Sequence, residues 1–345
     1  MTPAKLGYKM PPEWAEHQRT FMEWPRREAQ WPEPFEDVLP AFAAIVKAIA
    51  EFEPISVLAD PELVEEAARF CGHGLEIIPI EHNDSWMRDN GPTFLINERT
   101  ELAGVNWIFN AWGGKFPYHF DNLVAPKILK RFNILCFNAP LVMEGGAFHV
   151  DGDGTLLTTR ECLLNPNRNP HLKPEEIEGY LREYLNVSKI IWLNRGWVGD
   201  DTDGHVDNLA CFARPGQVIT QVCSDPGDPN YELSQENLAI LRNATDAKGR
   251  TLKITTIEQP PATYYKGLRL TLSYLNFYFV NAGIVLPVFG YETFDKAALT
   301  TLQSIFPERK IVTVDGLTIA RGGGNVHCLT QQMPAGITMN SRGDS

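Results

Sequence analysis

The sequence lacks several features that would mark other classes of protein. None of its six cysteines forms a Cys-x-x-Cys pair with another, and six thiols in 345 residues do not make a disulfide framework. The first residues hold no uninterrupted apolar stretch of the kind found in a secretion signal. The most apolar segment, residues 274–291, is interrupted by Asn276, Asn281, Gly283 and Pro287, which predicts adjacent core strands and no membrane span. We therefore expect a protein of the reducing cytoplasm.

Positive charge is also scarce. Lys and Arg total 31 against 43 Asp and Glu, which gives a net charge of −12. Such a surface repels phosphate backbones and anionic membranes, so we expect no nucleic-acid or membrane partner and favour a cationic substrate or partner. Hydrophobic residues make up 43% and charged residues 21%, a composition typical of a globular protein with a large core.

A helix followed by a strand recurs five times along the chain. The expected helices cover 61–71, 123–132, 174–185, 235–246 and 296–306, and the strands that follow begin at 75, 134, 189, 252 and 310. The spacing between these strands is nearly constant. A constant period favours a closed, radially repeated architecture over an ordinary doubly wound α/β sheet. We expect one catalytic domain over residues 1–345, with a short polar tail at 335–345. The Arg-Gly-Asp tripeptide in that tail is interpreted as a chance or cloning-derived sequence.

Four of the five strands lead into segments with residues suited to chemistry. These segments are EHNDSWMRDNGPT, NAPLVMEGGAFHVDGDGT, NRGWVGDDTDGHVDN and DGLTIARGGGNVHCLTQQ, whereas the fourth strand leads into the plainer EQPPATYYKG. If the units circle an axis, equivalent strand ends converge on one central site.

Cys328 is the candidate nucleophile. It follows Gly322, Gly323 and Gly324, and glycines let a loop turn sharply and approach a ligand closely. An isolated cysteine is about as often a small buried residue, and the other five cysteines are interpreted as core.

His205 and Asp207 form a His-x-Asp pair that, on a strand, would point to one face. A histidine with a carboxylate companion suits a general acid/base. A satisfied loop histidine is an alternative, and so is a metal site made by His205, Asp207 and Cys328. The lack of a second clustered histidine weakens the metal alternative.

Asp89, Glu144 and Asp207 would place three carboxylates around the one cysteine, although each alone is more often a turn or strand-end residue. Such a site needs a cation. A guanidinium fits because it is planar, permanently charged and able to donate five hydrogen bonds in fork geometry.

Six motifs of the chain resemble the agmatine deiminase family of the guanidine-modifying group. They are MPPEWAEHQRTFMEWP, NDSWMRDNGPT, EGGAFHVDGDGT, LLNPNRNP, GDDTDGHVDN and GGGNVHCLTQQMP, in the order of the family, and the likeness runs from Gly7 to Pro334. The resemblance implies an α/β fold, a five-bladed pseudo-symmetric propeller of ββαβ units. It also implies that Cys328 is the nucleophile and His205 the acid/base, with Asp89, Glu144 and Asp207 binding the guanidinium.

The expected reaction hydrolyses agmatine to N-carbamoylputrescine and ammonia through a covalent thiouronium on Cys328, with no metal and no cofactor. Trp86 would pack along the aliphatic chain or face the distal ammonium. Asp201, with Asp200 and Asp203, offers further negative charge, unless these residues only form turns. The alternatives are a deiminase of peptidyl or free arginine, a metal-dependent hydrolase, and a non-catalytic guanidine- or polyamine-binding protein. Assembly into a homo-oligomer stays open.

Overall fold

The strands of the computed structural model, which describes residues 1–27, 31, 33–72 and 74–338, form five small sheets and one two-stranded hairpin. Four of the sheets share one pattern, in which two antiparallel strands are followed by a helix and a third strand parallel to the second. In chain order these units are β4 (Thr93–Ile96), β5 (Leu102–Ile108), α5 (Val124–Arg131) and β6 (Leu135–Val142); β7 (Phe148–Val150), β8 (Thr155–Thr159), α7 (Pro174–Leu185) and β9 (Lys189–Leu193); β10 (Ala210–Arg214), β11 (Gln217–Val222), α8 (Asn230–Asn243) and β12 (Lys253–Glu258); and β15 (Tyr278–Val280), β16 (Gly283–Val288), α9 (Glu292–Ile305) and β17 (Lys310–Asp315).

The fifth sheet joins the two ends of the described chain. Its strand β18 (Gln331–Pro334) pairs antiparallel with β1 (His17–Glu23), and β1 leads through α1 (Val38–Ala50) to the parallel strand β2 (Ile55–Ala59). Helix α2 (Val64–Cys71) and strand β3 (Glu76–Pro79) then add a fourth strand. The first predicted helix–strand unit therefore corresponds to α2 and β3, the pair that adds a fourth strand to this sheet. The unit that matches the other four, α1 with β2, was missed by the sequence analysis.

The other predicted units are confirmed, with shifts at their ends. Helix α7 and the strands at Lys189 and Lys310 begin where expected, whereas α8 begins at Asn230, not at 235. Asp228 explains the earlier start, because its carboxylate accepts a hydrogen bond from the Asn230 backbone at 2.8 Å. The predicted end of that helix was too late because Asp246 closes a turn there, accepting hydrogen bonds from the backbone of Lys248 and Arg250. The apolar segment 274–291 forms β15 and β16, as predicted.

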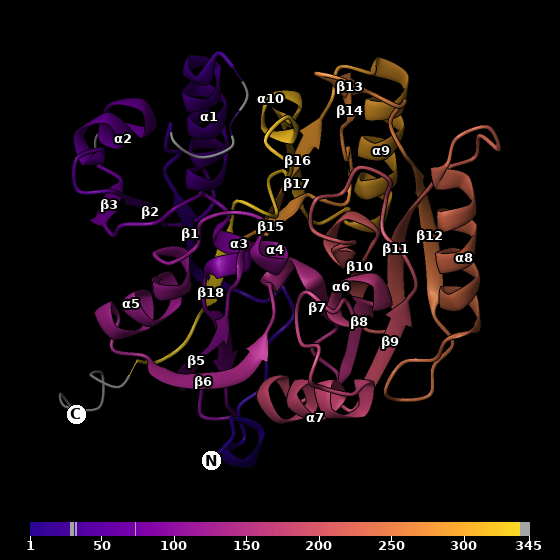
Figure 1. Cartoon of the computed structure of the whole chain (residues 1–345), viewed down its shortest axis with the longest axis horizontal. Helices are drawn as coiled ribbons and strands as arrows, with labels where there is room; N and C mark the ends of the chain where they lie inside the picture. Colours follow the sequence, from indigo (N-terminus) through magenta and orange to yellow (C-terminus); the bar gives the residue numbers. More distant parts are fainter. Residues whose placement is uncertain (28–30, 32, 73, 339–345) are drawn as a thin grey trace.

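The long helices lie on the outside of the molecule, and some of the short elements lie towards its middle (Figure 1). In Figure 1, α1, α5, α7, α8 and α9 follow one another around the rim, with α3 and α4 near the centre. The short elements are η1 (Ala4–Leu6), η2 (Phe35–Asp37), α3 (Met87–Asn90), α4 (Ala111–Gly114), η3 (Asp121–Leu123), η4 (Gly145–Ala147), α6 (Arg160–Leu163), η5 (Val206–Asn208), β13 (Tyr264–Tyr265), β14 (Leu268–Arg269) and α10 (Leu317–Ala320). The loops and turns of this central region hold the site described below.

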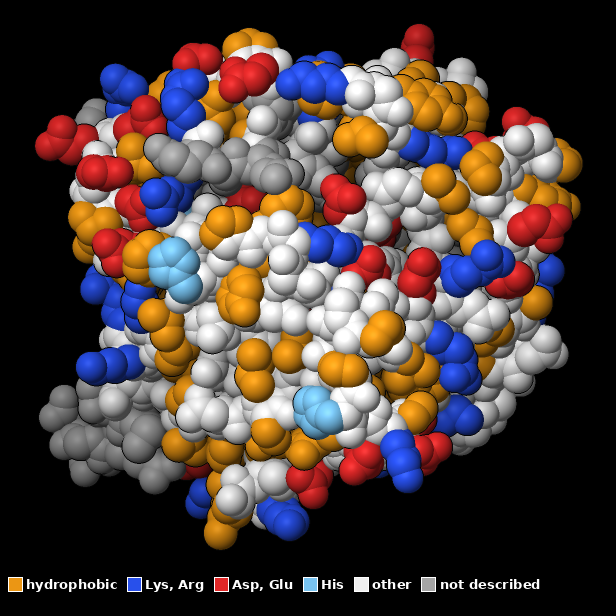
Figure 2. Space-filling model, in the orientation of Figure 1, with side chains coloured by type: hydrophobic (Ala, Val, Ile, Leu, Met, Phe, Trp, Pro, Cys, Tyr) orange, Lys and Arg blue, Asp and Glu red, His pale blue; other side chains and the backbone are white. Residues whose placement is uncertain are grey.

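The buried apolar residues gather in five clusters between helices and sheets. Helix α5 shows why such a helix forms: Val124, Ala125, Ile128 and Leu129 lie on one buried face, and Lys130 and Arg131 end it. Among the described residues, no helix combines the length and the apolar composition needed to cross a membrane. Acidic and basic side chains are interspersed over the face shown in Figure 2.

Candidate active site

A pocket with about 440 Å³ of open space brings predicted site residues from distant parts of the chain together. Its lining is aromatic, acidic and glycine-rich: Asp84, Trp86, Asp89, Trp112, Phe116, Asp201, Thr202, Gly322, Gly323, Gly324 and Cys328. Trp86 stacks on Trp31, with the ring centroids 5.3 Å apart, so its indole forms a fixed wall. Of the predicted residues, Trp86, Asp89, Asp201 and Cys328 line this pocket directly.

Cys328 lies at the inner end of the pocket and is 4% exposed. Its Sγ is 3.4 Å from Asp207 Oδ2, and Asn276 Nδ2 donates to Sγ at 3.1 Å. The backbone amide of Cys328 donates in return to Asn276 Oδ1 at 3.3 Å. A Cβ atom at Gly324 would lie 3.1 Å from Sγ and 2.5 Å from Trp86, which explains why the chain needs glycine before this cysteine.

A buried chain of polar side chains continues from Cys328 into the core. His327 faces Asp207 through Nδ1 at 3.0 Å and Glu13 through Nε2 at 2.9 Å. Glu13 also lies 3.4 Å from Arg88 Nη1 and 3.4 Å from His149 Nε2. We call the group Cys328, Asp207, His327 and Glu13 the Cys328 side of the site.

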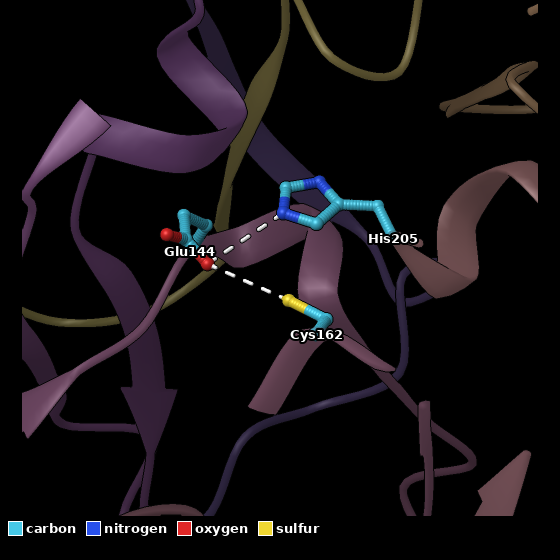
Figure 3. Close-up of side chains that lie close together, drawn as sticks. All are labelled: Glu144, Cys162 and His205. Atoms are coloured by element: carbon cyan, nitrogen blue, oxygen red, sulfur yellow. Dashed lines mark hydrogen bonds and ion pairs between the residues drawn. The ribbon is translucent and has the colours of Figure 1, made fainter. Parts of the chain in front are cut away.

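The opposite group, the His205 side, consists of His205, Glu144, Asp89 and Cys162. His205 is fully buried between two carboxylates, with Nδ1 3.8 Å from Asp89 Oδ1 and Nε2 3.6 Å from Glu144 Oε2. Neither ring nitrogen has a hydrogen-bond partner among the described residues. Figure 3 shows Glu144, Cys162 and His205 pointing toward one another. The Glu144 carboxylate is anchored from behind by Arg168, whose Nε donates to Oε1 at 2.7 Å.

The two sides meet at Gly146, whose backbone amide donates to Asp89 Oδ1 at 2.9 Å. A Cβ atom at this position would lie 2.6 Å from His205 Nδ1 and 2.9 Å from Asp207 Oδ2. Only glycine therefore lets the imidazole and both carboxylates approach so closely. Trp112 Nε1 donates to the second oxygen of Asp89 at 2.9 Å, which fixes the orientation of that carboxylate.

The pKa values of the three carboxylates shift in different directions, two downward and one upward. Burial alone would raise the pKa values of Glu144 and Asp207, but Arg168 holds that of Glu144 below its usual value and His327 does the same for Asp207. Burial raises the pKa of Asp89, with Asp207 and Glu144 adding to the effect against His205. Asp207 and Glu144 are therefore the carboxylates held ionised.

The two histidines and the cysteine are shifted upward. Burial by itself would lower the pKa of His205, but Asp89, Cys162 and Glu144 raise it well above its usual value. The pKa of His327 is also raised, because Glu13 and Asp207 outweigh burial and Arg88. Burial, followed by the charges of Asp207 and Asp89, raises the pKa of Cys328 well above its usual value. Both imidazoles therefore favour the protonated form, and Cys328 favours the thiol until a cation arrives.

Some sequence expectations need correction. The His-x-Asp pair does not lie on a strand: His205 caps η5 and Asp207 lies within it, and the tight turn brings both to Gly146. Asp200 is a turn residue, because its Oδ1 accepts a hydrogen bond from the Thr202 backbone at 2.9 Å. Asp203 is not among the lining residues and pairs with Arg168 and Lys115.

The sequence analysis missed several residues of the site. Asn276 lies in the connection after β12, the unit whose strand end looked plainest, and no local motif marks it. Glu13 and Arg168 stand in the quoted motifs MPPEW and LLNPNRNP, so their signal was present but unassigned. Cys162 is a core residue as predicted, and its Sγ also lies 3.8 Å from Glu144 Oε2. Among the described residues, the cluster able to ligate a metal is Glu144, Cys162 and His205, not the set of His205, Asp207 and Cys328 considered from the sequence.

Comparisons with known proteins place the chain in a family. Residues 9–334 match the Porphyromonas-type peptidyl-arginine deiminases. The chain is 52% identical over 335 residues to a provisionally named agmatine deiminase of Legionella pneumophila, with 96% of each covered, and 44% identical over 363 residues to the agmatine deiminase of Ectopseudomonas mendocina, with 97% of each covered. The solved structure of the Enterococcus faecalis agmatine deiminase superposes with a TM-score of 0.93 at 38% identity, covering 97% of this chain and 98% of that one. The chain belongs to the Porphyromonas-type peptidyl-arginine deiminase family, and its α/β fold is that of the solved agmatine deiminases.

Proposed function

We propose that this protein is an agmatine deiminase, a hydrolase of carbon–nitrogen bonds that converts agmatine and water to N-carbamoylputrescine and ammonia. The observation that carries the proposal is the pairing of a buried thiol with unsatisfied polar groups. Asp207 Oδ1 and both nitrogens of His205 are buried without a hydrogen-bond partner, and Cys328 lies 3.4 Å from the other oxygen of Asp207. A guanidinium would supply donors to these carboxylates and offset their charge.

The pocket outside the thiol suits agmatine better than arginine. The indoles of Trp86 and Trp112 and the ring of Phe116 fit an aliphatic chain, and the carboxylates of Asp84 and Asp201 suit a terminal ammonium. Burial raises the pKa of Asp84 to about 6, so this carboxylate is largely ionised at neutral pH. Among the described residues that line the pocket there is no Lys or Arg to meet the α-carboxylate of arginine.

The catalytic sequence uses covalent chemistry on Cys328. Asp89, Glu144 and Asp207 hold the guanidinium with its central carbon facing Sγ. The bound positive charge lowers the pKa of the Cys328 thiol, which loses its proton to solvent, and the thiolate attacks that carbon. The tetrahedral adduct collapses as protonated His205 gives its proton to the departing ammonia. Water then attacks the S-alkylthiouronium with His205 as the base, and loss of the thiolate yields the ureido product.

The arrangement of the units supports a finer description of the fold. We infer that residues 1–345 form one catalytic domain built as a five-bladed pseudo-symmetric α/β propeller of ββαβ units. The pairing of β18 with β1 and the succession of α1, α5, α7, α8 and α9 around the rim support it (Figure 1). We also infer that the enzyme works in the cytoplasm, where Cys328 stays reduced, and serves polyamine metabolism.

The test is an ammonia-release assay on the purified protein with agmatine, free arginine and a blocked arginine peptide. Agmatine should have the highest kcat/KM of the three by a wide margin. A preference for arginine or for the peptide would replace the proposal with a deiminase of free or peptidyl arginine. Binding without turnover of any substrate would indicate a guanidine-binding protein.

A further inference from the structure

The cluster of Glu144, Cys162 and His205 has the ligand atoms and the spacing to hold a metal ion, which deimination does not require. Each residue offers one ligand atom, these atoms all lie within 4.8 Å of one another, and all three side chains are fully buried. The residues come from three places, the loop after β6, helix α6 and the cap of η5. Figure 3 shows their ends converging on one point.

The contacts among these atoms are long ones that an ion would replace: Cys162 Sγ donates to Glu144 Oε2 at 3.8 Å, and Arg168 Nη2 lies 3.9 Å from Sγ. Metal binding would release the protons of Cys162 and His205. Arg168 occupies Glu144 Oε1, which leaves Oε2 3.6 Å from His205 Nε2 and 3.8 Å from Cys162 Sγ. His205 has no hydrogen-bond partner at either nitrogen among the described residues. Ligands of a tetrahedral Zn²⁺ with bonds of about 2.0–2.3 Å lie roughly 3.3–3.8 Å apart, so both separations match such an ion.

The surrounding charges allow a dication in spite of Arg168. Its guanidinium is already paired with Asp203, Nη1 to Oδ2 at 2.7 Å. Asp89 lies on the other side of the imidazole, with Oδ1 3.8 Å from His205 Nδ1, where carboxylates commonly orient a metal-bound histidine. Glu144, Asp89, Asp203 and a Cys162 thiolate together carry four negative charges, which balance Arg168, Lys115 and the dication once His205 has lost its proton to bind the ion.

We propose that Glu144, Cys162 and His205 form a binding site for Zn²⁺, and that the ion inhibits the enzyme by occupying the acid/base histidine and a guanidinium-binding carboxylate. Sulfur, imidazole and carboxylate ligands together favour zinc over magnesium or calcium. Inhibition rests on the proposed function, but metal binding does not. Because Zn²⁺ and the guanidinium would compete for Glu144 and His205, the inhibition is competitive with agmatine.

The binding test separates this site from the other buried thiol, Cys328. Two titrations are made on the wild type, Cys162→Ser, Cys328→Ala and the control Cys136→Ser. Binding of Zn²⁺ is measured by isothermal titration calorimetry, and binding of Co²⁺ is followed by its thiolate charge-transfer band. Cys136 is a partly exposed thiol outside the site. One ion should bind per chain in the wild type, Cys136→Ser and Cys328→Ala. Cys162→Ser should lose the Co²⁺ band and bind Zn²⁺ more than about 100-fold more weakly, a larger loss than removal of an outer-shell partner causes.

The opposite pattern would overturn the proposal. A band that survives in Cys162→Ser and disappears in Cys328→Ala would place the ion on Cys328, and the absence of a band in every protein would mean that no such site exists. If Cys162→Ser does not fold by circular dichroism, Glu144→Gln serves instead, because a neutral amide is a poor zinc ligand. These measurements need no turnover, so they stand even if agmatine is not the substrate.

The inhibition test uses the wild type, Cys136→Ser and Cys162→Ser with agmatine. Zn²⁺ should raise the apparent KM of the wild type and of Cys136→Ser, and a chelator should reverse the effect. In Cys162→Ser the concentration for half-inhibition should rise by more than about tenfold. Equal sensitivity of Cys162→Ser and the wild type would contradict inhibition through this site.

Discussion

The Cys328 side and the His205 side of the pocket differ in how completely their polar atoms are partnered. On the Cys328 side, His327 links Asp207 to Glu13 through contacts of 3.0 and 2.9 Å, and Asp207 Oδ1 is the atom of these four side chains left without a partner among the described residues. On the His205 side, both imidazole nitrogens lack a hydrogen-bond partner and lie more than 3.5 Å from the nearest carboxylates. Unsatisfied buried polar atoms are costly, so their presence points to a ligand that completes them. The comparison indicates that hydrogen bonds hold most of the Cys328 side in place, whereas the imidazole of the His205 side is left free of hydrogen bonds and can exchange protons with a leaving group or a water.

The largest effect is expected from Cys328→Ala. The variant should lose about 10⁴-fold or more of kcat on agmatine, because no other group can form the covalent intermediate. Cys328→Ser should not restore activity, since a hydroxyl ionises far less readily than a thiol. Ammonia release measures the loss, with Cys211→Ala as a buried control cysteine that should stay active. Substantial turnover by Cys328→Ala would remove this residue from the chemistry.

His205→Gln tests the other side of the site. Loss of a general acid/base should lower kcat by about 10²–10⁴-fold while the fold is kept. Because the amide can still hydrogen-bond the guanidinium, binding of agmatine measured by calorimetry should weaken far less than kcat falls. A variant with wild-type kcat would show that another group moves the protons.

Asp89→Asn and Asp207→Asn compare one carboxylate from each side. Each replaces charge-assisted hydrogen bonds worth about 1.5–3 kcal/mol, so kcat/KM on agmatine should fall by roughly 10- to 100-fold. Asp207→Asn should also lower kcat, because Asp207 contacts Cys328 at 3.4 Å. Steady-state kinetics give both values. If both variants keep the wild-type kcat/KM, these carboxylates do not hold the guanidinium.

A smaller effect concerns the outer end of the pocket. Asp201 lines the pocket and is exposed, and Asp225 is an exposed aspartate outside the lining, so Asp225→Asn is the control. Asp201→Asn should lower the ratio of kcat/KM for agmatine to that for arginine by about 2- to 5-fold, the size of an exposed charge interaction. An unchanged ratio would leave Asp84 as the carboxylate that faces the ammonium.

The smallest effect is a pH dependence of stability from the Cys328 side. The pKa of His327 is raised in the fold, with Glu13, Asp207, Arg88 and the Cys328 thiol as the neighbouring groups. The protonated ring therefore stabilises the protein fully below the ordinary histidine pKa of about 6.5, and this contribution is lost as the pH rises through the raised value. The urea concentration at the midpoint of unfolding should therefore fall as the pH is raised from 6.5 to 9.

His327→Gln should make this fall of the urea midpoint shallower, and the slope that remains belongs to other groups such as His205, whose pKa is also raised. His119→Gln, at an exposed histidine, should leave it as in the wild type. Equal slopes in the wild type and His327→Gln would show that His327 does not titrate between the two states.

Much of the site could be predicted from the sequence because its residues stand in local motifs beside glycines. Cys328, His205, Asp207, Asp89 and Glu144 all converge as expected. Local patterns also predicted the regular helices, since one apolar face such as that of α5 is visible in the sequence. What could not be predicted depends on contacts across the chain. Asn276 reaches Cys328 over 52 positions, and β18 pairs with β1 at the other end of the described chain. The unit α1–β2 was missed because the addition α2–β3 shows the same pattern nearby.

The most direct test of covalent catalysis is rapid acid quenching of the wild-type protein during turnover of agmatine, followed by mass spectrometry of its peptides. The account predicts a transient thiouronium on the peptide that contains Cys328 and on no other cysteine peptide, with none formed by Cys328→Ser. Full turnover with every cysteine peptide unmodified at all quench times, or an adduct on another cysteine, would contradict it.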